Sequence, residues 1–326
     1  MSNYLIAFGS VELIERVYNI LKKSEKDDSE ISVEKISDSF SMLSVSKDEF
    51  LRTNFDSVFF FKGWFQDHVS QSIVLGGNGF QKWTENNGIR SSTSGKEFEG
   101  AYISASFQNE TLSIRNDIFS YLPIIYFCNE ELFICSDSMY IISKLRTRLG
   151  MPCKLNKKVM HSRSWTHGLA CSVMSNQSQI DGVELLSPGK HIEIQIKKKL
   201  FSSRRSLQTR NYVKSSELKE VFNVDFKNYK EAIRDAATKL AQSTISLLHI
   251  EDVLIKFGLS GGLDSRVILA AVLHKPKLIE KIAITTNTHP SRKGDFDIVK
   301  KLSDEFNFTF NDENKLKAHK KKYSLK

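Results

Sequence analysis

The stretch Ser260-Gly261-Gly262-Leu263-Asp264-Ser265 decides how the C-terminal part of this 326-residue chain folds. The run Val253 to Phe257 just before it is rich in the residues of buried strands, and residues 265–273 after it resume helical spacing. Between a strand and a helix, backbone N–H groups and the helix dipole converge on an anion. The stretch therefore predicts an anion-binding loop at the start of a helix.

The residue types of this loop suit a phosphate group. Gly261 and Gly262 leave no Cβ in the way of phosphate oxygens and can adopt positive φ, while Ser260 and Ser265 add hydroxyl donors. Asp264 cannot itself attract a phosphate, so we expect it to hold Mg²⁺, which bridges phosphate oxygens. The lysine-containing pattern of ordinary P-loop NTPases is absent. The alternative is a glycine turn that only reverses the chain.

The rest of the sequence predicts two domains. Helical and strand patterns alternate over residues 220–326, which favours crossovers of a parallel sheet. Residues 1–196 consist mainly of short apolar or alternating segments bounded by turns, so we expect a layered α+β domain there. Residues 197–219 have the composition of a linker. We expect strands at 4–8, 58–61, 100–107, 112–114, 124–128, 132–136, 191–196, 253–257 and 281–286, and helices at 11–22, 157–167, 226–248, 265–273 and 295–306.

The overall composition excludes several classes of protein. Hydrophobic residues make up 40% and charged residues 26% of the chain, which suits globular cores. The apolar runs are too short to cross a bilayer and the start lacks the pattern of a signal peptide, so we expect a cytoplasmic protein without a membrane partner. Much of the net charge of +9 comes from residues 315–326, where Tyr323 is the only aromatic residue, so a nucleic-acid partner is not expected.

The four cysteines do not indicate a zinc site or a secreted disulfide framework. Cys128, Cys135, Cys153 and Cys171 lack the paired C-x-x-C spacing of zinc sites. We expect reduced structural thiols. A bridge between Cys128 and Cys135, across the turn that separates them, is the alternative under oxidation.

Two other segments could suggest sites. His161, Trp165 and His167 form a cluster, but no carboxylate or cysteine stands at ligand spacing, so metal binding is not expected. Gly76-Gly77-Asn78-Gly79 is rich in glycine, and no helical pattern opens directly behind it. We expect a hairpin turn there.

The loop matches the S-G-G-x-D-S signature of the ATP pyrophosphatase superfamily, and nearly the whole chain resembles the asparagine synthetase family. The segment Phe257 to Arg266 looks like the start of that family's synthetase domain. Asp117 to Tyr126 keeps the spacing of the family's R-D-x-x-G-x-x-P-L-Y-Y. Residues 133–137 resemble its F-A-S-E, and residues 183–189 resemble its I-x-x-L-x-P-G. The motifs occur in the family's order.

The resemblance implies a fold and a reaction. Residues 1–196 would form a class II amidotransferase-like domain of the N-terminal-nucleophile (Ntn) type with αββα layers, and residues 220–326 an incomplete α/β domain like the adenine nucleotide α-hydrolases. A small-molecule carboxylate would attack the α-phosphate of ATP, and ammonia or an amine would capture the acyl-adenylate. Aspartate to asparagine is the family default. The resemblance implies ATP and Mg²⁺ as cofactors, Asp264 as a metal ligand, and nucleotide contacts at Leu259, Ser260, Gly261, Gly262, Asp264, Ser265 and Ile284.

The N-terminal half departs from the family in two places. Ser2 stands where the family has its cysteine nucleophile, and a serine hydroxyl is much less acidic than a thiol. Lys62-Gly63-Trp64-Phe65-Gln66-Asp67 stands where the family has N-G-E-I-Y-N, without the asparagine beside the glycine. We therefore expect no glutamine hydrolysis, and a domain kept for architecture.

The C-terminal half departs as well, because the family's synthetase domain continues beyond the position where this chain ends. Asp295, Asp297 and the pair Asp304-Glu305 fit the start and the exposed face of a helix better than metal ligands. We expect a truncated or split ligase whose partner is a C-terminal synthetase fragment or a second copy. The rivals are a non-catalytic nucleotide-binding or scaffold relative and a tRNA-modifying ATP pyrophosphatase, which uses the same loop without the upstream domain.

Overall fold

The structure, a computed structural model, divides the chain into two compact units. One comprises residues 1–70 and 74–223, and the other residues 71–73 and 224–326. The residues described are 4–23, 31–45, 51–54, 57–67, 72–87, 98–108, 110–164, 175–198, 205–213, 226–248, 255–274 and 276–315. Ser2, Trp165, His167 and Cys171 lie outside these ranges.

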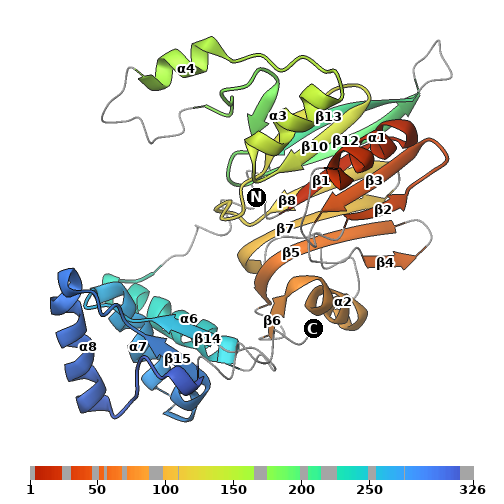
Figure 1. Cartoon of the computed structure of the whole chain (residues 1–326). Helices are drawn as coiled ribbons and strands as arrows, with labels where there is room; N and C mark the ends of the chain where they lie inside the picture. Colours follow the sequence, from red (N-terminus) through yellow and green to blue (C-terminus); the bar gives the residue numbers. More distant parts are fainter. Residues whose placement is uncertain are drawn as a thin grey trace. The chain divides into compact units, whose positions relative to one another are not determined.

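The elements are labelled in Figure 1 in chain order. Residues 4–213 form β1 (Leu5–Ser10), α1 (Val11–Lys22), β2 (Ile31–Lys35), β3 (Phe40–Val45), β4 (Leu51–Asn54), β5 (Ser57–Asp67), β6 (Ser72–Leu75), α2 (Gly76–Asn87), β7 (Phe98–Gln108), β8 (Thr111–Asn116), β9 (Ile125–Cys128), β10 (Leu132–Ser136), α3 (Met139–Arg148), α4 (Lys157–Ser164), β11 (Val183–Leu185), β12 (Lys190–Lys198) and β13 (Arg205–Val213). Residues 226–315 form α6 (Tyr229–Leu248), β14 (Ile255–Gly258), α7 (Leu263–Leu273), η2 (Pro276–Lys281), β15 (Ile282–Thr285), η3 (Pro290–Arg292) and α8 (Lys293–Phe306).

Two antiparallel sheets form the core of the first unit. The first has the strand order β11-β9-β10-β1-β3-β2, and the second β13-β12-β8-β7-β5-β4 with β6 on β5. Alternate residues of β1 point to opposite faces of the first sheet, so Ile6 and Phe8 face the second sheet while Leu5 and Ala7 face the helices α1 and α3. Phe8 meets Phe107 of the second sheet with ring centroids 5.7 Å apart.

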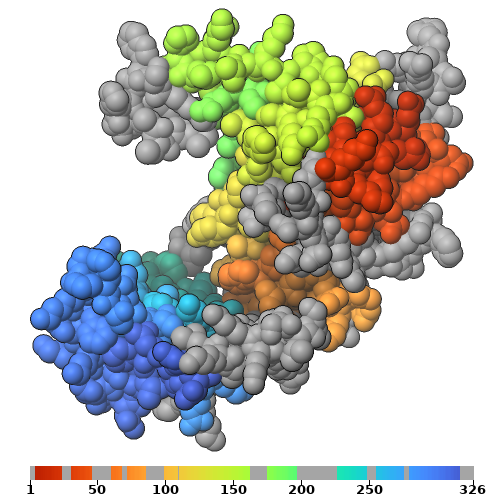
Figure 2. Space-filling view, in the orientation of Figure 1, coloured from red at the N-terminus to blue at the C-terminus, as the bar shows by residue number. Residues whose placement is uncertain are grey.

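Helices cover the outer face of each sheet. α1 buries Ile14, Val17 and Leu21, which recur at helical spacing, against the first sheet. Its exposed residues belong to the red surface in Figure 2. On the second sheet, Phe80 and Trp83 of α2 pack with aromatic residues of β5 and β7. The unit therefore has helix, sheet, sheet and helix layers, as Figure 1 shows, and the expected α+β arrangement is confirmed.

The hairpin turn expected at Gly76-Gly77-Asn78-Gly79 is wrong, because these residues begin α2. Helix propensity here is poor, and tertiary packing overrides it. The Phe61 and Phe80 rings stack with centroids 4.6 Å apart, and the Trp83 indole N–H donates to Asp67 Oδ2 at 2.9 Å. Long-range aromatic contacts of this kind leave no local sequence signal.

The segment 197–219, expected as a linker, contains strand β13. This strand pairs antiparallel with β12 from Lys190↔Val213 to Lys198↔Arg205. Strand pairing uses backbone groups, so a polar composition does not prevent it when a neighbouring strand offers an open edge.

The cysteine pair considered for a bridge is not aligned across the β9–β10 turn. Cys128 lies opposite Phe133, and Cys135 lies opposite Tyr126. Both thiols are free, as is Cys153. These three cysteines form no disulfide in the structure, and the reduced state stays a prediction.

The second unit contains the parallel strand pair that the sequence predicts. β14 and β15 align from Ile255↔Ile282 to Gly258↔Thr285, and α7 lies between them in the chain. Their core consists of Leu259, Leu269, Val272, Ile282, Ile284, Val299 and Phe308. Of the helices within the described ranges of the whole chain, none combines the length and the apolar character that crossing a membrane requires.

Candidate functional site

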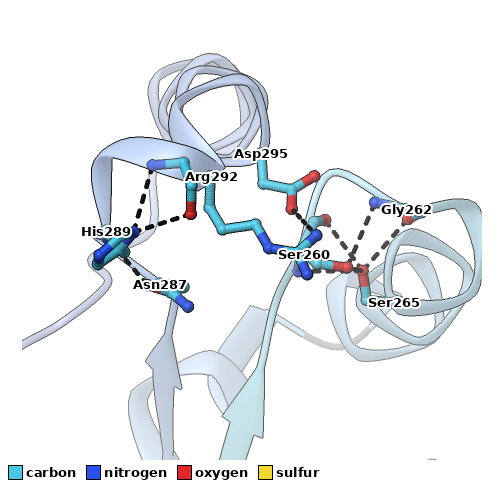
Figure 3. Close-up of polar contacts among 8 residues, drawn as sticks. Ser260, Gly262, Ser265, Asn287, His289, Arg292 and Asp295 are labelled. Carbon is cyan, nitrogen blue, oxygen red and sulfur yellow. Dashed lines mark hydrogen bonds and ion pairs between the residues drawn. The ribbon is translucent and has the colours of Figure 1, made fainter.

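The loop Ser260 to Ser265 lies at the carboxyl end of β14, and α7 starts inside it at Leu263. The carboxyl end of the parallel neighbour β15 leads through η3 into α8, which starts at Lys293. Parallel strands present their carboxyl ends at the same edge of a sheet, so the chain enters both helices from one edge. Figure 3 shows the two strand ends with the helices above them.

Two serine hydroxyls close the loop on itself. Ser265 Oγ lies 3.0 Å from Ser260 Oγ and accepts from the Ser260 backbone N–H at 3.1 Å. It also lies in donor range of the carbonyl oxygens of Ser260 at 2.9 Å and Gly262 at 3.2 Å. The Gly262 N–H donates to Ser260 Oγ at 3.3 Å. These bonds, drawn dashed in Figure 3, hold the loop in one shape.

The start of α7 offers hydrogen-bond donors to solvent. Gly262 is the N-cap residue, and no side chain caps the helix. Within the described part of the chain, the backbone N–H groups of Gly261, Leu263 and Asp264 have no acceptor. Unpaired N–H groups at a helix N-terminus favour an anion, through both hydrogen bonds and the helix dipole.

Asp264 presents its carboxylate to solvent in the first turn of α7. No ion pair to it is found among the described residues. A carboxylate in this position is a suitable oxygen ligand for Mg²⁺, and phosphate oxygens and water would complete the coordination. In the described ranges, the loop included, no group of three or more His, Cys, Asp or Glu side chains could hold a metal ion.

The two glycines have different surroundings. Neither has a positive φ, so the backbone freedom expected of them is not what the loop uses. A Cβ on Gly261 would lie 2.6 Å from Asp295 Oδ1, 2.9 Å from the Ile298 side chain and 3.1 Å from the Asp295 Cα. A Cβ on Gly262 would meet only Ser260 Oγ, at 3.3 Å. Gly261 is therefore the residue that lets α8 approach the loop.

Asp295 is a site residue that sequence reasoning assigned only to the helix start. It does lie in the first turn of α8, but it also contacts the loop through Gly261. Its other oxygen, Oδ2, lies 3.8 Å from Arg292 Nη1. No spacing pattern could have revealed this contact, because it depends on how two helices meet in space.

Leu259 and Ile284 do not present side chains at the site. Both are only 2% exposed and belong to the core of the second unit. The Leu259 N–H donates to Thr285 O at 2.8 Å, and Ile284 O accepts from the Asn311 N–H at 2.8 Å. These two residues therefore support the strand ends beneath the loop.

In the first unit, the segment Lys62 to Asp67 forms the end of β5. Gln66 and Asp67 are buried at 4% and 3% exposure, and Gly63 has a φ of 105°.

The Tyr4 hydroxyl donates to Pro123 O at 2.7 Å, and burial, together with Cys135 and Asp137, raises the pKa of Tyr4 well above its usual value. Because Ser2 lies outside the described residues, no geometry is assigned to it.

The chain was compared with known proteins. No protein-family model matches it, and no curated protein matches it. Among solved structures it is similar to one described as the allosteric regulatory enzyme of purine biosynthesis, with a TM-score of 0.38 and 9% identity over 87% of this chain and 64% of that chain. It is also similar to glutamine phosphoribosylpyrophosphate (PRPP) amidotransferase from B. subtilis complexed with ADP and GMP, with a TM-score of 0.34 and 8% identity over 87% of this chain and 65% of that chain. The chain thus spans less than two thirds of either, and the likeness is too distant to assign a family or a function.

Proposed function

We propose that the chain is an asparagine-synthetase-like, ATP-dependent, amide-forming ligase that binds the phosphates of ATP at the loop Ser260 to Ser265. The observation that carries this proposal is the set of N–H groups of Gly261, Leu263 and Asp264 at the start of α7, which have no acceptor among the described residues. Their place at the carboxyl end of a parallel strand is where α/β sheets bind ligands.

The proposed reaction has two steps. An oxygen of the substrate carboxylate forms a bond to the α-phosphorus, the bond from that phosphorus to the bridging oxygen breaks, and pyrophosphate leaves with the electron pair. The nitrogen of ammonia or an amine then attacks the carbonyl carbon of the acyl-adenylate, AMP leaves, and the nitrogen loses a proton to solvent. An amide, AMP and pyrophosphate are the products.

The loop's own residues would hold the leaving pyrophosphate. The three backbone N–H groups stabilise the charge that develops on the β-phosphate when the bridging bond breaks. The exposed hydroxyl of Ser260 and the half-buried one of Ser265 can rotate from each other toward phosphate oxygens, exchanging one hydrogen bond for another. Asp264 would hold Mg²⁺, which cancels part of the phosphate charge when bound.

We propose ammonia or a substrate amine, rather than glutamine, as the nitrogen source. Lys62 stands where the resemblance places an oxyanion asparagine, and its segment is part of strand β5 paired with β7. In this proposal the first unit keeps a class II amidotransferase-like, Ntn-type architecture without glutaminase activity.

The proposal is tested by calorimetric titration of the whole chain with ATP, with and without Mg²⁺. Wild type should bind Mg-ATP, and Asp264→Asn should lose most of the effect of Mg²⁺. The matched control is Asp297→Asn, an exposed aspartate in α8, which should behave like wild type. No binding of ATP by folded wild type would refute the proposal, as would an unchanged Mg²⁺ effect in Asp264→Asn.

Turnover is tested separately with a panel of carboxylates and amines that includes aspartate and ammonia. Release of pyrophosphate that requires both a carboxylate and the intact loop supports the ligase. Mg-ATP binding without pyrophosphate release for any pair in the panel, with or without an added C-terminal synthetase fragment, would favour the non-catalytic, nucleotide-binding relative. Release of pyrophosphate that requires tRNA rather than a carboxylate and an amine would favour the tRNA-modifying pyrophosphatase.

A further inference from the structure

We infer that Arg292 is the cation that contacts the phosphates at this loop, and that Asp295 positions it there. The inference rests on the proposed function and extends it, because Arg292 belongs to the segment after β15 and not to the loop motif. Two observations on one carboxylate carry the inference: Asp295 Oδ2 forms an ion pair with Arg292 at 3.8 Å, and Asp295 Oδ1 lies 2.6 Å from the position that a Cβ would take on Gly261.

The backbone fixes where the Arg292 side chain starts. Arg292 is the N-cap residue of α8, and its backbone N–H donates to His289 O at 2.8 Å. His289 in turn accepts from the Ser291 N–H, through its Nδ1, at 3.3 Å. This short turn aims the Arg292 side chain from the helix start toward the loop, as Figure 3 shows.

Asp295 fixes the position of the Arg292 guanidinium. Its Oδ2 lies 3.8 Å from Arg292 Nη1, while its Oδ1 lies against Gly261. Since the same carboxylate pairs with the guanidinium and lies beside Gly261, the ion pair places the guanidinium next to the loop. The Arg292 side chain remains 64% exposed, so most of its N–H donors face solvent and are open to an anion.

The loop motif itself supplies no positively charged side chain to balance phosphate. The loop motif contains no lysine, and Asp264 adds a negative charge at its surface. Arg266 of α7 already directs its Nε to Gly262 O at 3.4 Å, so Arg292 would supply a second positive charge to polyphosphate, beside the dipole of α7 and a bound Mg²⁺. A guanidinium presents a planar fork of donors that matches two phosphate oxygens at once, which an ammonium group does not.

The first experiment compares Arg292→Ala with Lys293→Ala by calorimetric titration. Both variants remove one positive charge at the start of α8, but Lys293 has no described contact near the loop. We expect Arg292→Ala to weaken Mg-ATP and Mg-pyrophosphate binding about tenfold and to leave adenosine binding unchanged. Lys293→Ala should change all three less than twofold. Equal losses in the two variants would mean that only surface charge matters, and would overturn the inference.

The second experiment tests the positioning role of Asp295 with a double-mutant cycle. Asp295→Asn keeps the size of the side chain and should weaken Mg-pyrophosphate binding severalfold when Arg292 is present. The same change in the Arg292→Ala background should have no further effect, and Arg292→Lys should recover only part of the affinity. Additive effects of the two changes would overturn the positioning role. If wild type binds neither ATP nor pyrophosphate, the proposed function is refuted. If wild type binds them and the variants bind equally well, only the role of Arg292 and Asp295 is refuted.

Discussion

Asp295 Oδ1 lies 2.6 Å from the position that a Cβ would occupy on Gly261. Real Cβ atoms do not approach a neighbour so closely, so the loop and α8 meet here only because residue 261 is glycine. The Asp295 Cα lies 3.1 Å from the same position, so rotation of the carboxylate alone would not relieve the contact.

We therefore expect Gly261→Ala to destabilise the second unit by about 1–3 kcal/mol, the usual cost of an overpacked contact. Gly262→Ala is the matched control, since its Cβ would meet only the Ser260 hydroxyl at 3.3 Å, and it should cost less than Gly261→Ala, about 1 kcal/mol or below, mainly from placing alanine at the N-cap. Urea unfolding followed by far-UV circular dichroism measures both. Equal stability of the two variants would contradict the close contact.

The positions of the tryptophans help to assign the unfolding transition to one of the two units. Trp64, Trp83 and Trp165 all precede residue 224, so tryptophan fluorescence reports on the first unit while circular dichroism reports on both. Gly261→Ala should shift the dichroism transition and leave the fluorescence transition in place.

The Ser265 hydroxyl should matter more than an ordinary helical hydroxyl. Ser265→Ala removes the bonds to Ser260 and Gly262, so we expect Mg-ATP affinity to fall severalfold and the second unit to lose about 1 kcal/mol. Ser246→Ala removes a hydroxyl that, among the described residues, donates to Gln242 O within α6, and this variant should bind Mg-ATP as wild type does. Calorimetry with both variants checks this, and equal affinities would argue against a closed loop.

Ser120 lies in an unfavourable backbone conformation that a glycine would relieve. Its φ is 56°, and its Oγ is buried without a hydrogen-bond partner among the described residues. We expect Ser120→Gly to stabilise the first unit by about 1 kcal/mol. Ser120→Ala keeps the strained φ and removes only the hydroxyl, so its gain should be smaller. The urea midpoint of unfolding, followed by tryptophan fluorescence, measures the stability of both variants. A Ser120→Gly variant no more stable than Ser120→Ala would contradict the strain at residue 120.

Alkaline pH should destabilise the first unit through Tyr4. Burial raises the pKa of Tyr4 well above the usual tyrosine value of 10.0, so the folded state keeps the proton that the unfolded state releases. The stabilising contribution is complete below pH 10 and declines above it, by up to about 1.4 kcal/mol per pH unit. Tyr4→Phe should show a shallower loss of stability between pH 10 and pH 11, measured by urea unfolding. An unchanged slope would show that the Tyr4 hydroxyl titrates normally.

Local patterns were enough to predict part of the fold. α1 (Val11–Lys22) and β10 (Leu132–Ser136) have the predicted bounds, because one carries an apolar stripe at helical spacing and the other is a short run of strand-forming residues. The strand, loop and helix around Ser260 also form as predicted, since the glycines and the flanking apolar runs are contiguous in the sequence.

Other elements have causes that lie far away in the chain. β3 (Phe40–Val45) is buried on both faces, with Met42 against the second sheet and Leu43 against the helices, so its sequence shows no alternation. At the loop, the motif residues were foreseen, but the contribution of Asp295 was not. That contribution requires knowing that α8 begins beside Gly261, which is a property of helix packing.

The position of β1 between β3 and β10 has a consequence for synthesis of the protein. Leu5 pairs with Val45 on one side and with Ser136 on the other, so one edge of β1 stays without its partner until β10 emerges from the ribosome. At about 5–20 residues per second, that wait lasts on the order of ten seconds. During this interval a nascent chain exposes the unpaired backbone N–H and C=O groups of Leu5 to Phe8 beside their apolar side chains, which is the kind of edge that chaperones bind and that pairs wrongly with other chains.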